Sequence, residues 1–124
     1  MKYFKESEFK HYNKMQFDLL KILDEFREYC GYPIVIHSDY RENSERHRSG
    51  MAVDIHIQGI NVFDQFLLAE RCGKFKGIGI YPCWNNKGLH IDIYKNGRWI
   101  AYTDGTGKQQ YTALNFDNVK RYIF

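Results

Sequence analysis

Two short segments alternate apolar and polar residues in the same way, and they constrain the fold more than any other feature of the chain. The first is AVDIHI, residues 52–57, and the second is LHIDIY, residues 89–94. Because successive side chains of a β-strand point to opposite faces, each segment predicts a strand with one apolar and one polar face. The apolar faces need a core, and the acidic and imidazole groups opposite need partners wherever they are buried.

The polar faces of these two segments supply the candidate site. Asp54 and His56 lie on the first face, His90 and Asp92 lie on the second, and His47 precedes the first segment. If the strands are neighbours, His47, Asp54 and His90 offer two imidazole nitrogens and one carboxylate oxygen. This set suits catalytic zinc, which keeps three protein ligands and one open position. The residues alone leave a second interpretation open, a solvated loop followed by an edge strand, and His56 is most simply a hydrogen-bonded surface group.

Other elements surround these segments. Further strands are expected in IVIHS (34–38), GIGIY (77–81) and RWIAY (98–102). Helices are expected over residues 12–29, 61–73 and 115–122. The pair Asn96–Gly97 predicts a hairpin between LHIDIY and RWIAY. Order and spacing indicate one α+β domain spanning residues 1–124, with helices packed on one face of a largely antiparallel sheet.

The composition is that of an ordered, self-sufficient domain. The chain has 124 residues, 44% of them hydrophobic and 17% aromatic, so it can bury a core without structural metals. Cys30, Cys72 and Cys83 are far apart and form no C-x-x-C pair, which predicts free thiols. The net charge of +3 is spread along the chain, so a nucleic-acid partner or a nuclease activity is the weakest hypothesis. We expect a monomer.

A series of motifs runs along the chain in a recognisable order. They are Ser44, His47, Gly50, Ala52, Asp54–Ile55 and His90-x-Asp92, supported by LLKILDEFREYCGYPIVIHSDYR, GIGIYP and GLHIDI. This pattern resembles the M15 family of zinc peptidases, the D-alanyl-D-alanine carboxypeptidase-like group that shares its fold with the Hedgehog signalling domain. Within that family, the short branch found in phages and bacteria is similar to residues 4–102. The resemblance implies a Hedgehog/DD-peptidase fold.

The resemblance also implies roles for individual residues. His47, Asp54 and His90 match the family's zinc (Zn2+) ligands. Arg41 matches the arginine that lies beside the metal and holds the substrate or its developing oxyanion, a role that suits an always-charged guanidinium. The implied activity is zinc-dependent hydrolysis of amide bonds in peptidoglycan stem peptides, by a carboxypeptidase or an endopeptidase. Tyr81 is a candidate substrate contact.

The chain departs from the family at the expected acid. Better-known members place a Glu, Asp or His two or three residues before the last ligand, where this chain has Lys87 and Gly88. Asp92 is therefore the candidate catalytic base, since it lies on the same strand face as His90. Its alternative role is to orient a ligand imidazole through the other ring nitrogen. The missing acid also supports an alternative function, a zinc-binding recognition module without catalysis.

The cleft rim also differs from the family. Only five residues separate Arg41 from His47, and this shorter loop brings Glu45, Arg46 and Arg48 to the expected rim. Four aromatic residues either line the cleft or belong to the core, namely Tyr40, Tyr81, Trp84 and Tyr94.

The sequence shows no targeting or membrane segment. The first residues, MKYFKESEFKHYNK, contain no continuous apolar stretch of the kind found in a secretory signal peptide. No later run approaches the length that spans a membrane. We therefore expect a protein that is cytoplasmic, or one that reaches the cell wall through a phage-type lysis system.

Overall fold

The centre of the fold is a six-stranded sheet. The computed structural model describes all residues, 1–124. The strands lie in the order β1-β2-β4-β3-β5-β6, and every neighbouring pair is antiparallel except β3 with β5. Their bounds are Ile34–Ser38 (β1), Ala52–Ile57 (β2), Gly77–Tyr81 (β3), Gly88–Asp92 (β4), Gly97–Thr103 (β5) and Gln109–Ala113 (β6). The predicted α+β class and the largely antiparallel sheet are confirmed.

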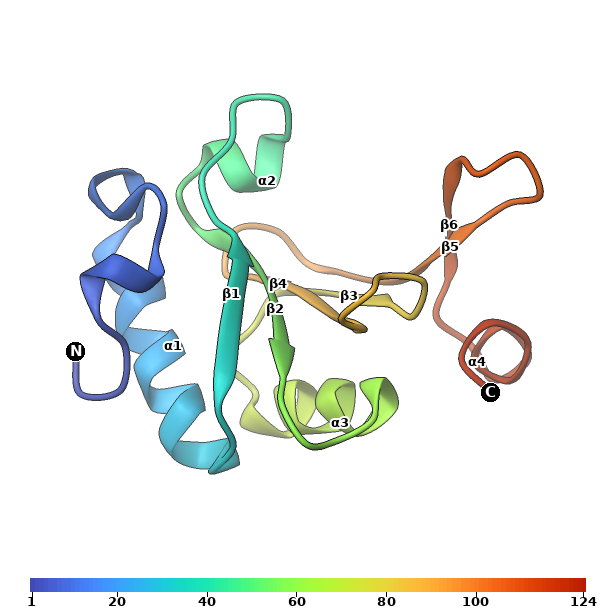
Figure 1. Cartoon of the computed structure of the whole chain (residues 1–124), viewed down its shortest axis with the longest axis horizontal. Helices are drawn as coiled ribbons and strands as arrows, with labels where there is room; N and C mark the ends of the chain where they lie inside the picture. Colours follow the sequence, from blue (N-terminus) through green and yellow to red (C-terminus); the bar gives the residue numbers. More distant parts are fainter.

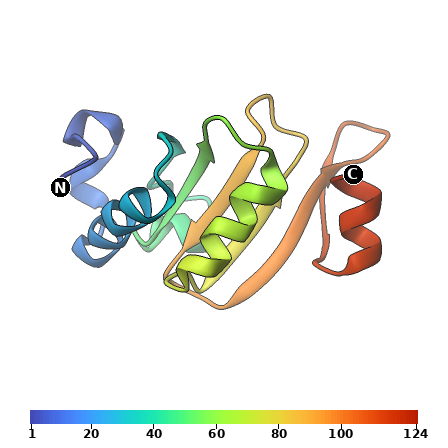
Figure 2. The same cartoon turned by 90° about the horizontal axis from the view of Figure 1, so that it is seen from below.

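Helices lie on both faces of this sheet. Their bounds are Phe17–Cys30 (α1), Glu45–Arg48 (α2), Val62–Cys72 (α3) and Phe116–Tyr122 (α4), and short 3-10 turns cover Glu6–Glu8 and Tyr12–Lys14. Helix α3 lies below the sheet in Figure 1 and in front of it in Figure 2, α1 lies beside β1 at one end, and α4 lies beside β5 and β6 at the other, whereas α2 lies above the sheet. The upper face is therefore left for α2 and the polar side chains. None of the helices has the length and apolar character needed to cross a membrane.

The core lies between the sheet and the helices α1 and α3. It includes the predicted apolar faces of β2 and β4 and the inner faces of both helices, namely Val53, Ile55, Ile57, Leu89, Ile91, Leu19, Leu23, Phe26 and Phe66. Burying a side chain of this size is worth about 1.5–3 kcal/mol, so the core fixes which face of each strand points inward. The polar faces of β2 and β4 consequently point to the opposite side.

The helix ends follow the expected capping chemistry. Asn61 caps α3 and Asn115 caps α4, each by accepting a backbone N–H three residues later at 2.9 Å. The first helix begins at Phe17 and not at residue 12 as predicted. Gln16 has an extended backbone conformation, and its N–H donates to the carbonyl of Gly50 at 2.9 Å instead of to a helical carbonyl. This bond ties the N-terminal segment to the loop that precedes β2.

The predicted hairpin between β4 and β5 is wrong. Strand β4 already pairs with β2 on one edge and β3 on the other, so no edge remains for β5. The chain instead crosses the end of β3 and pairs parallel to it, with Gly97 beside Gly77 and Trp99 beside Gly79. Strand β6, which the sequence did not predict, then pairs with β5 and forms the edge of the sheet.

Two glycines of β3 leave room on the upper face. A Cβ atom at Gly79 would collide with the indole of Trp99, and one at Gly77 would collide with the side chains of Asp92 and Arg46. Each collision would force rearrangement of a packed side chain. The absent side chains of β3 therefore let Trp99 and Arg46 lie directly on the strand.

We expect Gly79→Ala to lower the free energy of unfolding by about 1–3 kcal/mol, because the added methyl group displaces the indole of Trp99. Gly105→Ala is the matched control, since a Cβ atom there meets nothing within 4 Å. Urea titrations of the two variants and the wild type measure the difference. Equal unfolding midpoints for Gly79→Ala and Gly105→Ala would contradict this account of β3.

Candidate metal centre

Three elements bring the predicted ligands together. The antiparallel register of β2 and β4 places Asp54 directly opposite His90, and α2 carries His47 above them. Ser44 caps α2 by accepting the backbone N–H of His47 at 3.4 Å. Gly50 then turns the chain back toward β2 with a φ of +74°, a left-handed conformation that favours glycine.

The potential ligand atoms of these residues converge in a buried place. Oδ1 of Asp54 lies 3.3 Å from Nε2 of His47 and 3.2 Å from Nδ1 of His90. All three side chains are buried, and their ligand atoms lie within 4.8 Å of one another. Nε2 of His47 is the one buried side-chain nitrogen or oxygen in the chain without a hydrogen-bond partner. A buried polar atom left unpaired is costly, and a metal ion would satisfy it.

The outward nitrogens of both imidazoles are already held. Nδ1 of His47 donates to the backbone carbonyl of Asp39 at 2.6 Å, and Nε2 of His90 donates to Oδ2 of Asp92 at 2.6 Å. The other ring nitrogens face Asp54, and Nδ1 of His90 is hydrogen-bonded to its Oδ1 at 3.2 Å. Once these two nitrogens carry no proton, their lone pairs are available to a metal ion. This arrangement is typical of histidine ligands, whose remote N–H is fixed by a carbonyl or a carboxylate. The residues therefore fit a divalent metal ion such as zinc.

The two buried carboxylates are held in the ionised form. Burial alone would raise the pKa of Asp54, but the imidazoles of His47 and His90 outweigh it and hold that pKa well below its usual value. Burial likewise opposes ionisation of Asp92, yet bonds from His90, the Lys95 backbone and Arg46 lower its pKa to about 2. Both groups thus carry a negative charge at neutral pH, as a metal ligand and its supporting group should.

The surroundings of Asp92 bear on its two predicted roles. Oδ2 accepts from His90 and from Nη1 of Arg46 at 2.7 Å, and Oδ1 accepts the backbone N–H groups of Tyr94 and Lys95 at 3.0 Å each. The side chain is fully buried. Because four donors already occupy its oxygens, this geometry favours the role of orienting His90 over the role of catalytic base.

Arg41 lies beside the ligand group, where the resemblance expects it. Its Nη1 donates to Oγ of Ser38 at 2.7 Å and to Oδ2 of Asp54 at 3.0 Å. The side chain is 41% exposed, so the rest of the guanidinium remains accessible from solvent. The same carboxylate therefore has one oxygen directed to the histidines and the other held by Arg41.

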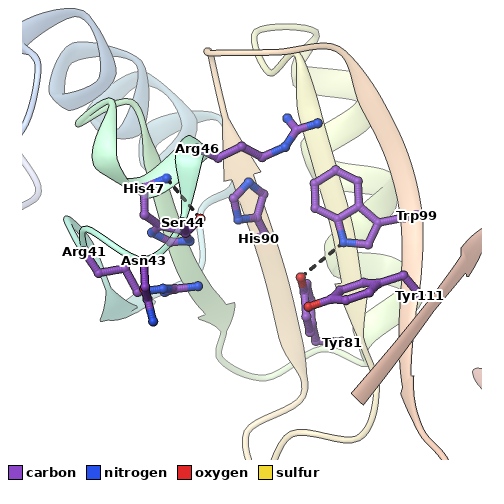
Figure 3. A pocket seen from close by; sticks show the side chains of 9 residues that line it. All are labelled: Arg41, Asn43, Ser44, Arg46, His47, Tyr81, His90, Trp99 and Tyr111. Carbon is purple, nitrogen blue, oxygen red and sulfur yellow. Dashed lines mark hydrogen bonds between the residues drawn. The ribbon is translucent and has the colours of Figure 1, made fainter. Parts of the chain in front are cut away.

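A pocket of about 530 Å³ opens next to the ligand group (Figure 3). Its lining consists of Arg41, Asn43, Ser44, Arg46, His47, Tyr81, His90, Trp99 and Tyr111. Tyr81 thus lines the pocket as predicted, and its hydroxyl accepts a hydrogen bond from Nε1 of Trp99 at 3.2 Å. The other predicted aromatic residues, Tyr40, Trp84 and Tyr94, are not among the lining residues.

Asn43, Trp99 and Tyr111 line the pocket but were not identified from the sequence. Arg46, which was expected at the rim, does line the pocket, but it is largely buried, and its guanidinium lies 4.8 Å from the ring centre of Trp99. Gly77 and Gly79, on the polar face of β3, were the sequence signal that large side chains such as those of Arg46 and Trp99 lie against this strand. No motif pointed to Tyr111, which reaches the pocket from β6.

His56 lies outside the ligand group. Its Nδ1 is hydrogen-bonded to Nε2 of His37, and the two rings stack with centroids 4.7 Å apart. Burial, together with the neighbouring His37, lowers the pKa of His56. The structure therefore agrees with the simpler interpretation of this residue as a hydrogen-bonded histidine.

No family model matches the chain, and neither does any curated protein or solved structure compared with it. The M15 resemblance and the Hedgehog/DD-peptidase fold consequently remain predictions. The case for a function rests on the residues of the site and on their geometry.

We expect the purified protein to bind one zinc ion per chain. His47→Ala removes one of three ligands, so its zinc affinity should fall by at least about 100-fold. His56→Ala is the matched control, because it removes a histidine from the same sheet face that is not a ligand. Elemental analysis after dialysis against a competing chelator measures the difference. Equal zinc retention by His47→Ala and wild type would exclude this site.

Zinc binding should also release protons near neutral pH. Burial opposes protonation of His90, but the carboxylates of Asp54 and Asp92 outweigh it and raise its pKa above the usual 6.5 in the metal-free protein. Below this raised pKa, protons compete with zinc for the nitrogen of His90. The zinc affinity should therefore weaken as the pH falls. Calorimetry in buffers of different ionisation enthalpy counts the protons released. A pH-independent affinity between pH 6 and 8 would contradict this coupling.

Proposed function

We propose that the protein is a zinc-dependent peptidase that hydrolyses amide bonds in peptidoglycan stem peptides. The observation that carries the proposal is the buried group of His47, Asp54 and His90, whose inward ligand atoms converge beside a pocket. Two histidines and one carboxylate that leave an open position are a usual ligand set for catalytic zinc. The M15 resemblance over residues 4–102 supports peptidoglycan as the substrate.

The chemistry is divided between the metal and the chain. Zinc held by His47, Asp54 and His90 would supply Lewis acidity to polarise a carbonyl group and to activate water near neutral pH. Arg41 presents its accessible donors to the pocket, where they stabilise negative charge that develops on the carbonyl oxygen. Asp92 accepts the Nε2 proton of His90 and so favours the tautomer whose Nδ1 can bind a metal ion.

One observation favours the second candidate function, a zinc-binding recognition module. None of the nine residues that line the pocket is an Asp or Glu, and the oxygens of Asp92 are already occupied. The chain has Lys87 and Gly88 where M15 peptidases have an acidic residue or a histidine, and no other carboxylate lines the pocket in its place. A module that only binds needs no group to transfer protons.

Mass analysis of muropeptides after incubation with the zinc-loaded protein tests the proposal, because fragment masses identify the bond that is cut. We expect cleavage by wild type and by His56→Ala, and no cleavage by His47→Ala, whose fold is checked by circular dichroism. Asp92→Asn should retain about 1–10% of the activity, since it loosens the orientation of His90. If the zinc-loaded wild type binds muropeptides but cleaves none of them, the recognition module is the correct function.

A further inference from the structure

The C-terminal segment, residues 103–124, lies outside the region of M15 resemblance, yet it reaches the pocket. Its strand β6 carries Tyr111, which lines the pocket together with Tyr81 and Trp99. Figure 3 shows the ring of Tyr111 beside that of Tyr81, on the side of the pocket opposite Arg41 and Asn43. Tyr111 is 60% exposed, so it contributes little to the core. These three side chains form an aromatic wall.

The rest of the segment holds Tyr111 in place. Strand β6 pairs with β5, with Tyr111 beside Ala101. Helix α4 braces the hairpin, because Asn118 donates to Oγ1 of Thr112 at 3.1 Å and to the carbonyl of Ala113 at 2.8 Å. In addition, the ring of Tyr122 stacks on that of Tyr102 at 4.2 Å between centroids. An exposed tyrosine on a braced strand is a preorganised contact surface.

Two arginines also line the pocket. Arg41 lies opposite the aromatic wall, whereas the guanidinium of Arg46 lies over the ring of Trp99. Each directs only Nη1 to its buried carboxylate partner, Asp54 or Asp92. These two ion pairs cancel in charge, and no carboxylate lines the pocket, so a divalent metal would leave it with a net positive charge. Guanidinium groups with free N–H donors bind carboxylates well. The pocket is therefore suited to an anionic ligand.

We propose that the pocket binds a peptide that carries a carboxylate, with the carboxylate on the side of Arg41 and the adjoining peptide against the aromatic wall. Tyr111 is then a specificity-determining residue, and residues 103–124 serve to position it. The peptide nature of the ligand rests on the proposed function. The carboxylate is either a free C-terminus of the substrate or an acidic group within the peptide.

Stopped-flow tryptophan fluorescence of the zinc-loaded chain reports binding before turnover, since Trp99 belongs to the aromatic wall. The probe is the pentapeptide L-Ala-γ-D-Glu-L-Lys-D-Ala-D-Ala, compared with its C-terminal amide, its isoglutamine form and the doubly amidated peptide. We expect double amidation to raise the Kd at least about 10-fold. Whichever single amide reproduces this loss identifies the source of the carboxylate. Equal binding of the doubly amidated peptide would overturn the proposal.

The same assay tests Tyr111. Tyr111→Ala should raise the Kd about 10-fold, whereas Tyr111→Phe, which keeps the ring, should stay within about twofold of wild type. Tyr29→Ala, an exposed tyrosine of α1, is the control and should bind as wild type does. Zinc content is measured for each variant. Wild-type binding by Tyr111→Ala would refute its role, and because cleavage is assayed separately, a chain that binds without cleaving overturns only the peptidase proposal.

Discussion

The antiparallel pairing of β2 with β4 is the constraint on which the rest of the site depends. It sets Asp54 opposite His90, so that Nδ1 of His90 lies 3.2 Å from Oδ1 of Asp54. A slip of one residue would turn either side chain to the other face of the sheet. The register is held from the far side, where Val53 and Ile91 are buried against the helices. The apolar core thus enforces the geometry of a polar site that it does not touch.

A second constraint is that three carboxylates in and beside the site are buried. Asp39, Asp54 and Asp92 are all buried, and each has a cationic or histidine partner on its outer side. These partners are His11, Arg41 and Arg46, respectively. Buried charges are tolerated only where partners and hydrogen bonds compensate them. Arg41 and Arg46 therefore compensate buried negative charge in addition to any contact they make with a ligand.

Much of this arrangement could be predicted from local patterns, and the rest depends on tertiary contacts. Period-two alternation identified the strands that carry Asp54 and His90, and capping residues such as Asn61 marked the helix ends. A turn signal such as Asn96–Gly97 acts locally and carries no information on whether β4 still has a free edge. The burial of Arg46 depends on Asp92, far away in sequence, and Tyr111 belongs to no motif at all.

Asp39 gives the N-terminal segment a part in the site. Its backbone carbonyl accepts a hydrogen bond from Nδ1 of His47 and so orients that imidazole. Its carboxylate accepts hydrogen bonds from the backbone N–H and from Nδ1 of His11, each at 2.8 Å. One residue thus joins the docking of residues 1–16 to the orientation of a metal ligand. The docking of the N-terminal segment and the binding of a metal ion at His47 would share Asp39, so the two equilibria would be coupled, and the coupling would be reciprocal. A metal ion bound at His47 would therefore stabilise the docked N-terminal segment against proteolysis, and displacement of that segment would weaken metal binding.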